Sequence, residues 1–350
     1  MTEQVIMKNT PDLLVSADSH VIEPSNLWAE RLPPQLRDLA PSYPPRTTLQ
    51  AHDGGLDPRV RAREMAMDGV SGEILYASLA LKQFGLTDAT LQESCFRIYN
   101  DWLIDYCAHT PERLFGVGTI STYRIDNAVQ EAHRCRKAGM RGLMIWQVPP
   151  PELSFAGDHY ERFWATAQEL QMPVSMHTLT GMPYGPDMAK KSTDVTIHLA
   201  HSVNMKLLYA NNALLQIITS GVLERFPRLK IVLVENEASW LPFVLSEWDK
   251  YCLKGKGHVS QMTMLPSEYF KRQVYATFFN DPPARLLFSG WGIDNCMWSN
   301  AFPHQNSTWP KSRDVIARDL GHLPGASRAK ILHENVTRLY DLPAFAPVTD

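Results

Sequence analysis

Short runs of apolar residues recur along the chain and alternate with longer segments whose apolar residues are spaced three and four apart. Each run is apolar throughout rather than alternating with polar residues, which is typical of parallel strands buried on both faces. The runs predict eight strands, at residues 13–15, 73–76, 115–120, 142–146, 173–177, 230–235, 274–278 and 296–299. The spaced segments predict helices at residues 26–31, 59–68, 89–109, 126–138, 160–170, 194–225 with Gly221 as a candidate break, 239–253, 313–320 and 326–340.

The alternation of strands and helices predicts an α/β fold, a (β/α)8 TIM barrel, as a single domain over residues 1–350. Seven prolines from Pro24 to Pro58 exclude one regular element after the first strand. Residues 25–72 are therefore expected to form a long Pro-rich insertion or arm, packed over the barrel or against a neighbouring subunit. Residues 321–350 are expected to close the chain with helices.

The composition narrows the expected partners and location of the protein. The chain is 44% hydrophobic and has a formal net charge of −3 without a strongly basic run, so nothing indicates a nucleic acid or an anionic membrane as a partner. No stretch approaches the eighteen apolar residues of a membrane span, and the first residues lack the apolar core of a signal peptide. The five scattered cysteines fit reduced thiols. We expect a cytoplasmic protein.

Donor side chains for a metal stand at the ends of several predicted strands. Asp18 and His20 are two positions apart at the end of the first, so they leave the strand on the same side. His177 ends the fifth strand, Glu235 ends the sixth, and His304 follows the eighth. Each of these alone is weak evidence, because a lone strand-end histidine is more often structural. In a TIM barrel, however, the carboxyl ends of the strands share one face, where a metal could activate a water or a substrate oxygen.

Other candidates have competing structural interpretations. Glu23 is either a metal ligand or the cap of a turn, with equal weight. His304 either contacts the substrate and orients its loop, or makes only a loop hydrogen bond. Trp146 and Trp298 are candidate substrate-binding residues, with the barrel core as the alternative for Trp146. His201 is either a contact to the substrate or a second metal, or a polar residue at the start of a helix.

Several segments together resemble the amidohydrolase superfamily, in the branch that includes aminocarboxymuconate semialdehyde decarboxylase and γ-resorcylate decarboxylase. The resemblance covers nearly the whole chain. It is carried by residues 18–24 (DSHVIEP), 176–177 (MH), 226–235 (FPRLKIVLVE), 239–242 (SWLP), 297–304 (MWSNAFPH) and 331–340 (ILHENVTRLY).

The resemblance implies a single metal held by a strand-one H-x-H pair or its acidic variant, a strand-five histidine and a strand-eight aspartate. Asp18, His20 and His177 fall on the first three ligand positions. Glu23 matches the acidic residue of a D-x-H-x-x-E-P subgroup, and Glu235 falls where other members have His or Glu near the substrate or the metal. The implied cofactor is a divalent ion such as Zn, Mn or Fe.

The chain departs from the family at the end of the eighth strand. Similar sequences read W-x-x-D-[FY]-P-H, whereas here the aspartate position is occupied by Ala301. A methyl group neither binds a metal nor moves a proton. Two hypotheses follow: an inactivating Asp-to-Ala substitution, or a naturally degenerate member that accompanies an active one. Asn300 is a possible substitute, whereas Asp294 precedes the strand and lies at its wrong end.

Three hypotheses for function remain open at this point. The first is a metal-dependent hydrolase or carboxy-lyase that hydrolyses a C–N or C–C bond or decarboxylates a small organic or aromatic acid. The second is a dinuclear Fe/Mn non-haem oxygenase of the same fold, like an amine N-hydroxylase, with Glu23, His201 and Glu235 as extra donors. The third is a catalytically degenerate partner subunit, motivated by Ala301. A homo- or hetero-oligomer with related barrel subunits is expected.

Overall fold

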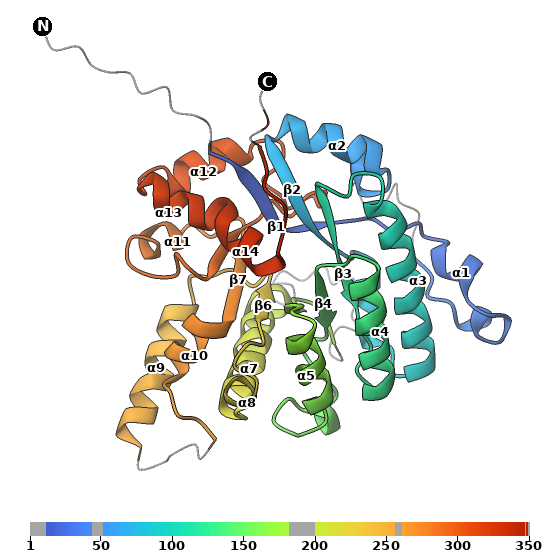
Figure 1. Ribbon diagram of the computed structural model, residues 1–350, viewed down its shortest axis with the longest axis horizontal. Helices are drawn as coiled ribbons and strands as arrows, with labels where there is room; N and C mark the ends of the chain where they lie inside the picture. The colour runs from blue at the N-terminus through green and yellow to red at the C-terminus, as the bar shows by residue number, and fades with distance from the viewer. Residues whose placement is uncertain (1–11, 44–51, 182–199, 256–260, 347, 349–350) are drawn as a thin grey trace, which may run out of the picture.

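The computed structural model describes residues 12–43, 52–181, 200–255, 261–346 and 348, except for the side chains of residues 200–202. Eight parallel strands follow one another in chain order around the sheet, each bonded to the next (Figure 1). This confirms the predicted TIM barrel. The strands are β1 (Leu14–His20), β2 (Val70–Tyr76), β3 (Leu114–Thr119), β4 (Gly142–Ile145), β5 (Val174–His177), β6 (Ile231–Val234), β7 (Val274–Phe278) and β8 (Cys296–Trp298).

Helices surround the strands in most of the positions predicted from the spacing of apolar residues. Gly221, with φ of 74°, separates α7 from α8 as expected. The α-helices are α1 (Leu27–Arg31), α2 (Pro58–Met67), α3 (Ala89–Cys107), α4 (Ile125–Lys137), α5 (Glu161–Glu169), α7 (Lys206–Thr219), α8 (Val222–Arg225), α9 (Leu241–Lys254), α10 (Pro266–Gln273), α11 (Ala284–Leu287), α12 (Ser312–Leu320), α13 (Gly325–Ala329) and α14 (Asn335–Tyr340). Two π-helical stretches, Ala200–Met205 and Lys330–Glu334, precede α7 and α14.

The main chain after β8 closes the barrel against β1. The backbone N–H of His20 donates to the carbonyl of Phe302 at 2.6 Å, and the N–H of Ala301 donates to the carbonyl of Asp18 at 3.1 Å. Strand β1 is longer than its apolar run because its polar residues, Ser16, Asp18, Ser19 and His20, are also fully buried. The end of β1 is thus held inside the protein rather than at its surface.

The segment after β1 is irregular, as its prolines predict. It contains α1, the 3-10 helices Pro34–Leu39 and Asp53–Gly55, and then α2. The expected boundary at residue 72 was wrong, because β2 already begins at Val70. Gly72 looks like a breaker in the sequence, but it lies inside the strand, where a Cβ atom would meet the ring of Phe345 at 2.6 Å.

One large apolar core runs through the barrel and under its helices, with Trp28, Trp164 and Phe96 among its fully buried side chains. Cys296 belongs to this core, as expected, and all five cysteines are free thiols. Within the described residues, no helix combines the length and the hydrophobicity needed to cross a membrane.

Candidate metal centre

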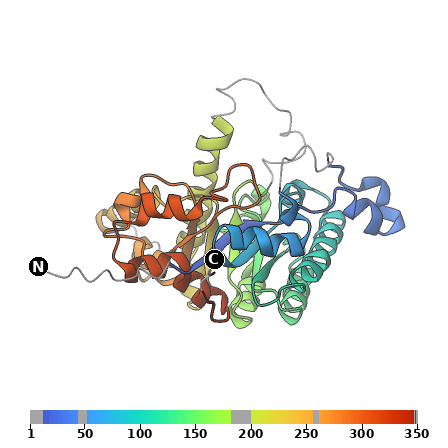
Figure 2. The same ribbon diagram turned by 90° about the horizontal axis from the view of Figure 1, so that it is seen from above.

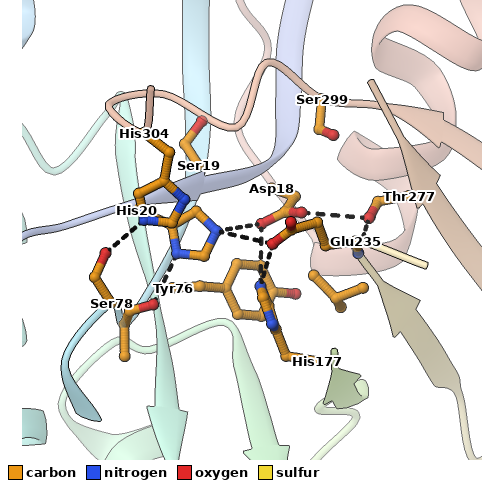
Figure 3. Close-up of polar contacts among 12 residues, drawn as sticks. Asp18, Ser19, His20, Tyr76, Ser78, His177, Glu235, Thr277, Ser299 and His304 are labelled. Atoms are coloured by element: carbon orange, nitrogen blue, oxygen red, sulfur yellow. Dashed lines mark hydrogen bonds and ion pairs between the residues drawn. The ribbon is translucent and has the colours of Figure 1, made fainter. Parts of the chain in front are cut away.

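Four predicted donor residues meet at the carboxyl ends of the strands. Asp18 and His20 come from β1, His177 from the end of β5, and Glu235 from the residue after β6 (Figure 3). One ligand atom from each lies within 4.8 Å of all the others. His20 Nε2 is 3.4 Å from Asp18 Oδ1, and His177 Nε2 is 3.5 Å from Glu235 Oε2. The structure therefore brings together the side chains that the sequence placed on one face.

Hydrogen bonds to the backbone fix both imidazoles in one tautomer. The Nδ1–H of His20 donates to the carbonyl of Ala77 at 2.7 Å, and the Nδ1–H of His177 donates to the carbonyl of Thr178 at 2.8 Å. Since each ring then carries its proton on Nδ1, the Nε2 atoms present lone pairs toward the shared point. Metal-binding histidines in proteins are held in this way.

The converging atoms are acceptors without a donor. Asp18 Oδ1, His20 Nε2 and His177 Nε2 are buried and have no hydrogen-bond partner among the described residues. Burial of unpaired polar atoms is unfavourable, so each such group requires an explanation. A divalent cation supplies one, because two imidazole nitrogens and two carboxylates suit Zn, Mn or Fe. The residues present therefore fit a metal ion.

The electrostatic surroundings favour the binding of a cation by these four side chains. Burial lowers the pKa of His177 to about 4 and also lowers the pKa of His20, so both rings are neutral at neutral pH. Burial, followed by repulsion from Glu235, raises the pKa of Asp18. Two carboxylates in so enclosed a site need a positive charge between them, which a metal would provide.

Backbone geometry directs Glu235 into the site. Its φ of 55° is a left-handed conformation that is unusual for a glutamate. Its N–H donates to Thr277 Oγ1 at 2.8 Å, and that hydroxyl lies 3.5 Å from Asp18 Oδ2. Thr277 thus links the two carboxylate residues across β7. The carboxylate of Glu235 is 19% exposed, whereas Asp18 and both histidines are fully enclosed.

Ala301 stands beside the donor set without contributing to it. Its backbone is left-handed, with φ of 55°, and its side chain is buried. Aspartate and asparagine tolerate this conformation better than alanine does, so the loop keeps a shape that suits an aspartate. The sequence left the far side of the metal site without a ligand. In the structure, the group that could hold a metal has Glu235 as its second carboxylate and does not include residue 301.

The residues flanking Ala301 support the site from outside. The His304 ring stacks on His20, with ring centroids 4.0 Å apart, and its Nε2 is 2.8 Å from Ser78 Oγ. Asn300 Oδ1 accepts from Ser19 Oγ at 2.8 Å and from Ser16 Oγ at 3.2 Å. Neither residue belongs to the group that could hold a metal. His304 makes a hydrogen bond of the kind that its structural alternative predicted, and its ring also packs on the His20 ring.

Glu23 takes the turn-capping alternative. Its carboxylate accepts from the backbone N–H groups of Ser78, Leu79 and Ala80, two of them at 2.9 and 3.1 Å, at the start of the 3-10 helix Ala80–Gly85. Burial raises its pKa to about 6. Glu23 is not among the four residues of the described group that could hold a metal, and its role as a metal ligand stays a prediction.

Two of the three candidate substrate-binding residues, Trp146 and Trp298, are buried. Trp146 is 1% exposed and its indole N–H donates to Tyr160 Oη at 2.9 Å, which places it in the core. Trp298 is equally buried, and its indole N–H has no partner among the described residues. The side chain of His201 lies outside the described residues.

Two basic residues near the site were not identified from the sequence. Arg61 of α2 is fully buried, donates to Glu73 at 2.6 Å and to the carbonyl of His20 at 2.5 Å, and lies over the Phe302 ring. Lys206, the first residue of α7, has its Nζ 3.9 Å from Glu235 Oε1. Neither stands in a motif, and only the tertiary fold brings them to the barrel mouth.

Comparison with known proteins agrees with this fold. A γ-resorcylate decarboxylase from Polaromonas sp. is 24% identical over 306 residues, which cover 81% of this chain and 86% of that protein. The crystal structure of 5-carboxyvanillate decarboxylase from Sphingomonas paucimobilis superposes with a TM-score of 0.73 at 20% identity, covering 95% and 99% of the two chains.

A dihydroxybenzoic acid decarboxylase from Polaromonas, solved with bound manganese, superposes with a TM-score of 0.71 at 19% identity and covers 94% of this chain and 97% of its own. At such identities the superpositions establish the shared fold. The family model described as amidohydrolase matches residues 51–342, which is most of the chain. The chain therefore belongs to the amidohydrolase family of metal-dependent enzymes.

Proposed function

We propose that the protein binds one divalent metal ion through Asp18, His20, His177 and Glu235 and removes CO₂ from a small aromatic acid. The convergence of these four donors within 4.8 Å carries the metal assignment. The choice of decarboxylation is supported by the relatives, which are named for the decarboxylation of γ-resorcylate, 5-carboxyvanillate and dihydroxybenzoic acid. Manganese in one of them supports Mn²⁺ as a suitable ion.

The bound ion would supply Lewis acidity toward the oxygen atoms of the substrate. The protein holds the donors rigidly: Nδ1 of each histidine is locked by a carbonyl, and Thr277 ties Asp18 to Glu235. Loss of CO₂ leaves a carbon that must gain a proton, and Ala301 cannot give one. We assign that proton transfer to Glu235 Oε1, which would take the proton from solvent and pass it to the carbon, because Glu235 is the partly exposed carboxylate and its Oε2 faces the histidines.

The described residues weigh against the two alternatives. A dinuclear oxygenase needs further donors, yet Glu23 is engaged by backbone N–H groups and Glu235 already belongs to the first set. A degenerate partner subunit is expected to have lost its metal site through Ala301. The four donors converge without any contribution from that residue.

Metal analysis combined with a decarboxylation assay tests the proposal. The purified chain is dialysed against Mn²⁺ or Zn²⁺, its metal content is measured by mass spectrometry, and CO₂ release is followed with 2,6-dihydroxybenzoate and 5-carboxyvanillate. We expect about one ion per chain and metal-dependent CO₂ release. His177→Ala should lower metal affinity by more than about 100-fold, since it removes a buried ligand, whereas the exposed His322→Ala should leave it unchanged.

The other outcomes point to the alternatives. Two iron or manganese ions per chain would favour the dinuclear oxygenase. One ion per chain without CO₂ release from any aromatic acid would contradict decarboxylation while leaving the metal site in place. A chain that retains no metal after dialysis contradicts the proposed site itself and favours the partner subunit.

A further inference from the structure

Lys206 lies at the barrel mouth beside the open side of the metal site. Figure 2 shows the first turns of α7, in yellow-green, standing clear of the rest of the barrel. The Lys206 side chain nevertheless reaches the site, because its Nζ lies 3.9 Å from Glu235 Oε1 and the side chain is only 23% exposed. This separation is longer than a hydrogen bond, so the ammonium is near the carboxylate without being locked to it.

The charges of the site change their balance when a metal binds. Asp18 and Glu235 contribute two negative charges, and the histidines contribute none because each is a neutral tautomer. Without a metal, Lys206 offsets part of this negative charge. A divalent ion offsets both carboxylates of the donor set, so the positive charge of Lys206 is no longer needed to balance them.

Two further acidic residues near Glu235, Asp281 and Glu237, bear on the charge of Lys206. Asp281 Oδ2 is engaged by the backbone N–H groups of Ala238 and Ser239, at 2.8 and 2.7 Å. Glu237 is a further carboxylate whose charge acts on Lys206, but its Oε2 is buried and has no hydrogen-bond partner among the described residues. Among the described residues, the polar contact of the Lys206 ammonium is the 3.9 Å ion pair with Glu235, so its three N–H donors are available to a ligand.

We infer that Lys206 binds the carboxylate of the substrate next to the metal and so selects singly charged aromatic acids over neutral aromatics. This inference rests on the proposed function, since it assigns the recognition of the substrate in the same site. A lysine suits the task because a partly enclosed ammonium forms charge-assisted hydrogen bonds with a carboxylate. Ala301, on the other side, adds no negative charge that would repel the acid.

A pair of probes of matched shape separates charge recognition from shape recognition. The manganese-loaded protein is titrated by calorimetry with 2,6-dihydroxybenzoate and with its neutral amide, 2,6-dihydroxybenzamide. We expect Lys206→Met to weaken binding of the acid by about 10- to 100-fold and binding of the amide by less than about 3-fold. Lys206→Arg should retain most of the affinity for the acid, and Lys250→Met, an exposed lysine on α9, should change neither.

Metal content is measured in the same samples, so that a failure of the Lys206 inference is distinguished from a failure of the proposed function. The inference is overturned if Lys206→Met binds the acid as tightly as the wild-type protein, or if it weakens the acid and the amide equally. The proposed function fails instead if the wild-type protein holds no manganese or binds neither probe.

Discussion

The proposed metal site has two sides, which lie next to each other at the carboxyl ends of the strands but contribute different chemistry. The ligand side holds the proposed ligands Asp18, His20, His177 and Glu235, whose ligand atoms lie within 4.8 Å of one another. The support side is the segment Asn300–His304 after β8. Its backbone bonds the end of β1 at Asp18 and His20, and its His304 ring stacks on His20.

The difference shows that the support side has two separable roles. The resemblance implies that this segment supplies an aspartate ligand to the metal, and Ala301 cannot serve as one. The architecture remains, because the left-handed backbone and the bonds to β1 do not depend on the side chain at 301. The second carboxylate of the ligand set now comes from the end of β6 instead of the end of β8.

Moving the carboxylate back to β8 is the strongest test. Glu235→Gln should weaken manganese binding by about 10- to 1000-fold and abolish CO₂ release, because a neutral amide replaces a charged ligand. Ala301→Asp in the Glu235→Gln background should recover at least about 10-fold of the metal affinity, since the backbone at 301 accommodates an aspartate. Metal titrations of the two variants and the double variant measure the exchange.

Ala301→Asp alone is the matched control, because it adds a carboxylate while Glu235 is kept. If the double variant binds metal no better than Glu235→Gln, position 301 does not face the metal point. The idea of exchangeable carboxylates would then be abandoned.

Removing the anchor of the support side should affect stability more than metal binding. Asn300 Oδ1 accepts from two serine hydroxyls and from the N–H of Phe302 at 3.1 Å. Asn300→Ala removes three buried hydrogen bonds and leaves the N–H of Phe302 without its acceptor, so the free energy of unfolding should fall by about 2–4 kcal/mol. Urea denaturation measures it, with the exposed Asn212→Ala as control. A loss of metal affinity at unchanged stability would place Asn300 on the ligand side.

A pH effect behind the support side is the smallest expected change. Asp68 accepts from the N–H and the hydroxyl of Ser312, and burial raises its pKa from 3.8 to about 6. The folded state therefore binds a proton more tightly than the unfolded state, so Asp68 lowers stability as pH rises from 4 to 6. The whole elevation corresponds to at most about 3 kcal/mol.

Asp68→Asn should remove this pH-dependent contribution to the free energy of unfolding. The stability of the variant relative to the wild type should increase by about 1–3 kcal/mol between pH 4 and pH 6 and stay level above that range. Urea titrations at several pH values measure the difference, and the exposed Asp105→Asn serves as control. A difference that decreases with pH would contradict the raised pKa of Asp68.

The fold was predictable because each buried parallel strand leaves a local mark in the sequence. The apolar runs at 274–278 and 142–146 match β7 and β4 to within a residue. The start of β2 was missed because Gly72 resembles a turn residue, and its reason, the packed ring of Phe345, is far away in the chain. Helices α10 and α11 were missed because they are short, with eight and four residues.

The site was predictable where its chemistry follows strand ends and unpredictable where it depends on contacts across the barrel. Asp18, His20, His177 and Glu235 were named from their positions alone. That Glu23 caps a turn depends on the N–H groups of residues 78–80, which no local pattern ties to it. Lys206 and Arg61 reach the site from helices, and a helix surface gives no signal of where its charged residues point.

The left-handed backbone at Ala301 has an evolutionary consequence. Two of the four alanine codons differ from an aspartate codon by a single base, and the loop already has a conformation that an aspartate accepts. A lineage could therefore gain or lose a carboxylate at this position in one mutational step without remodelling the loop. If Glu235 can hold the metal meanwhile, the two ligand arrangements are connected by a path on which every intermediate keeps a complete metal site.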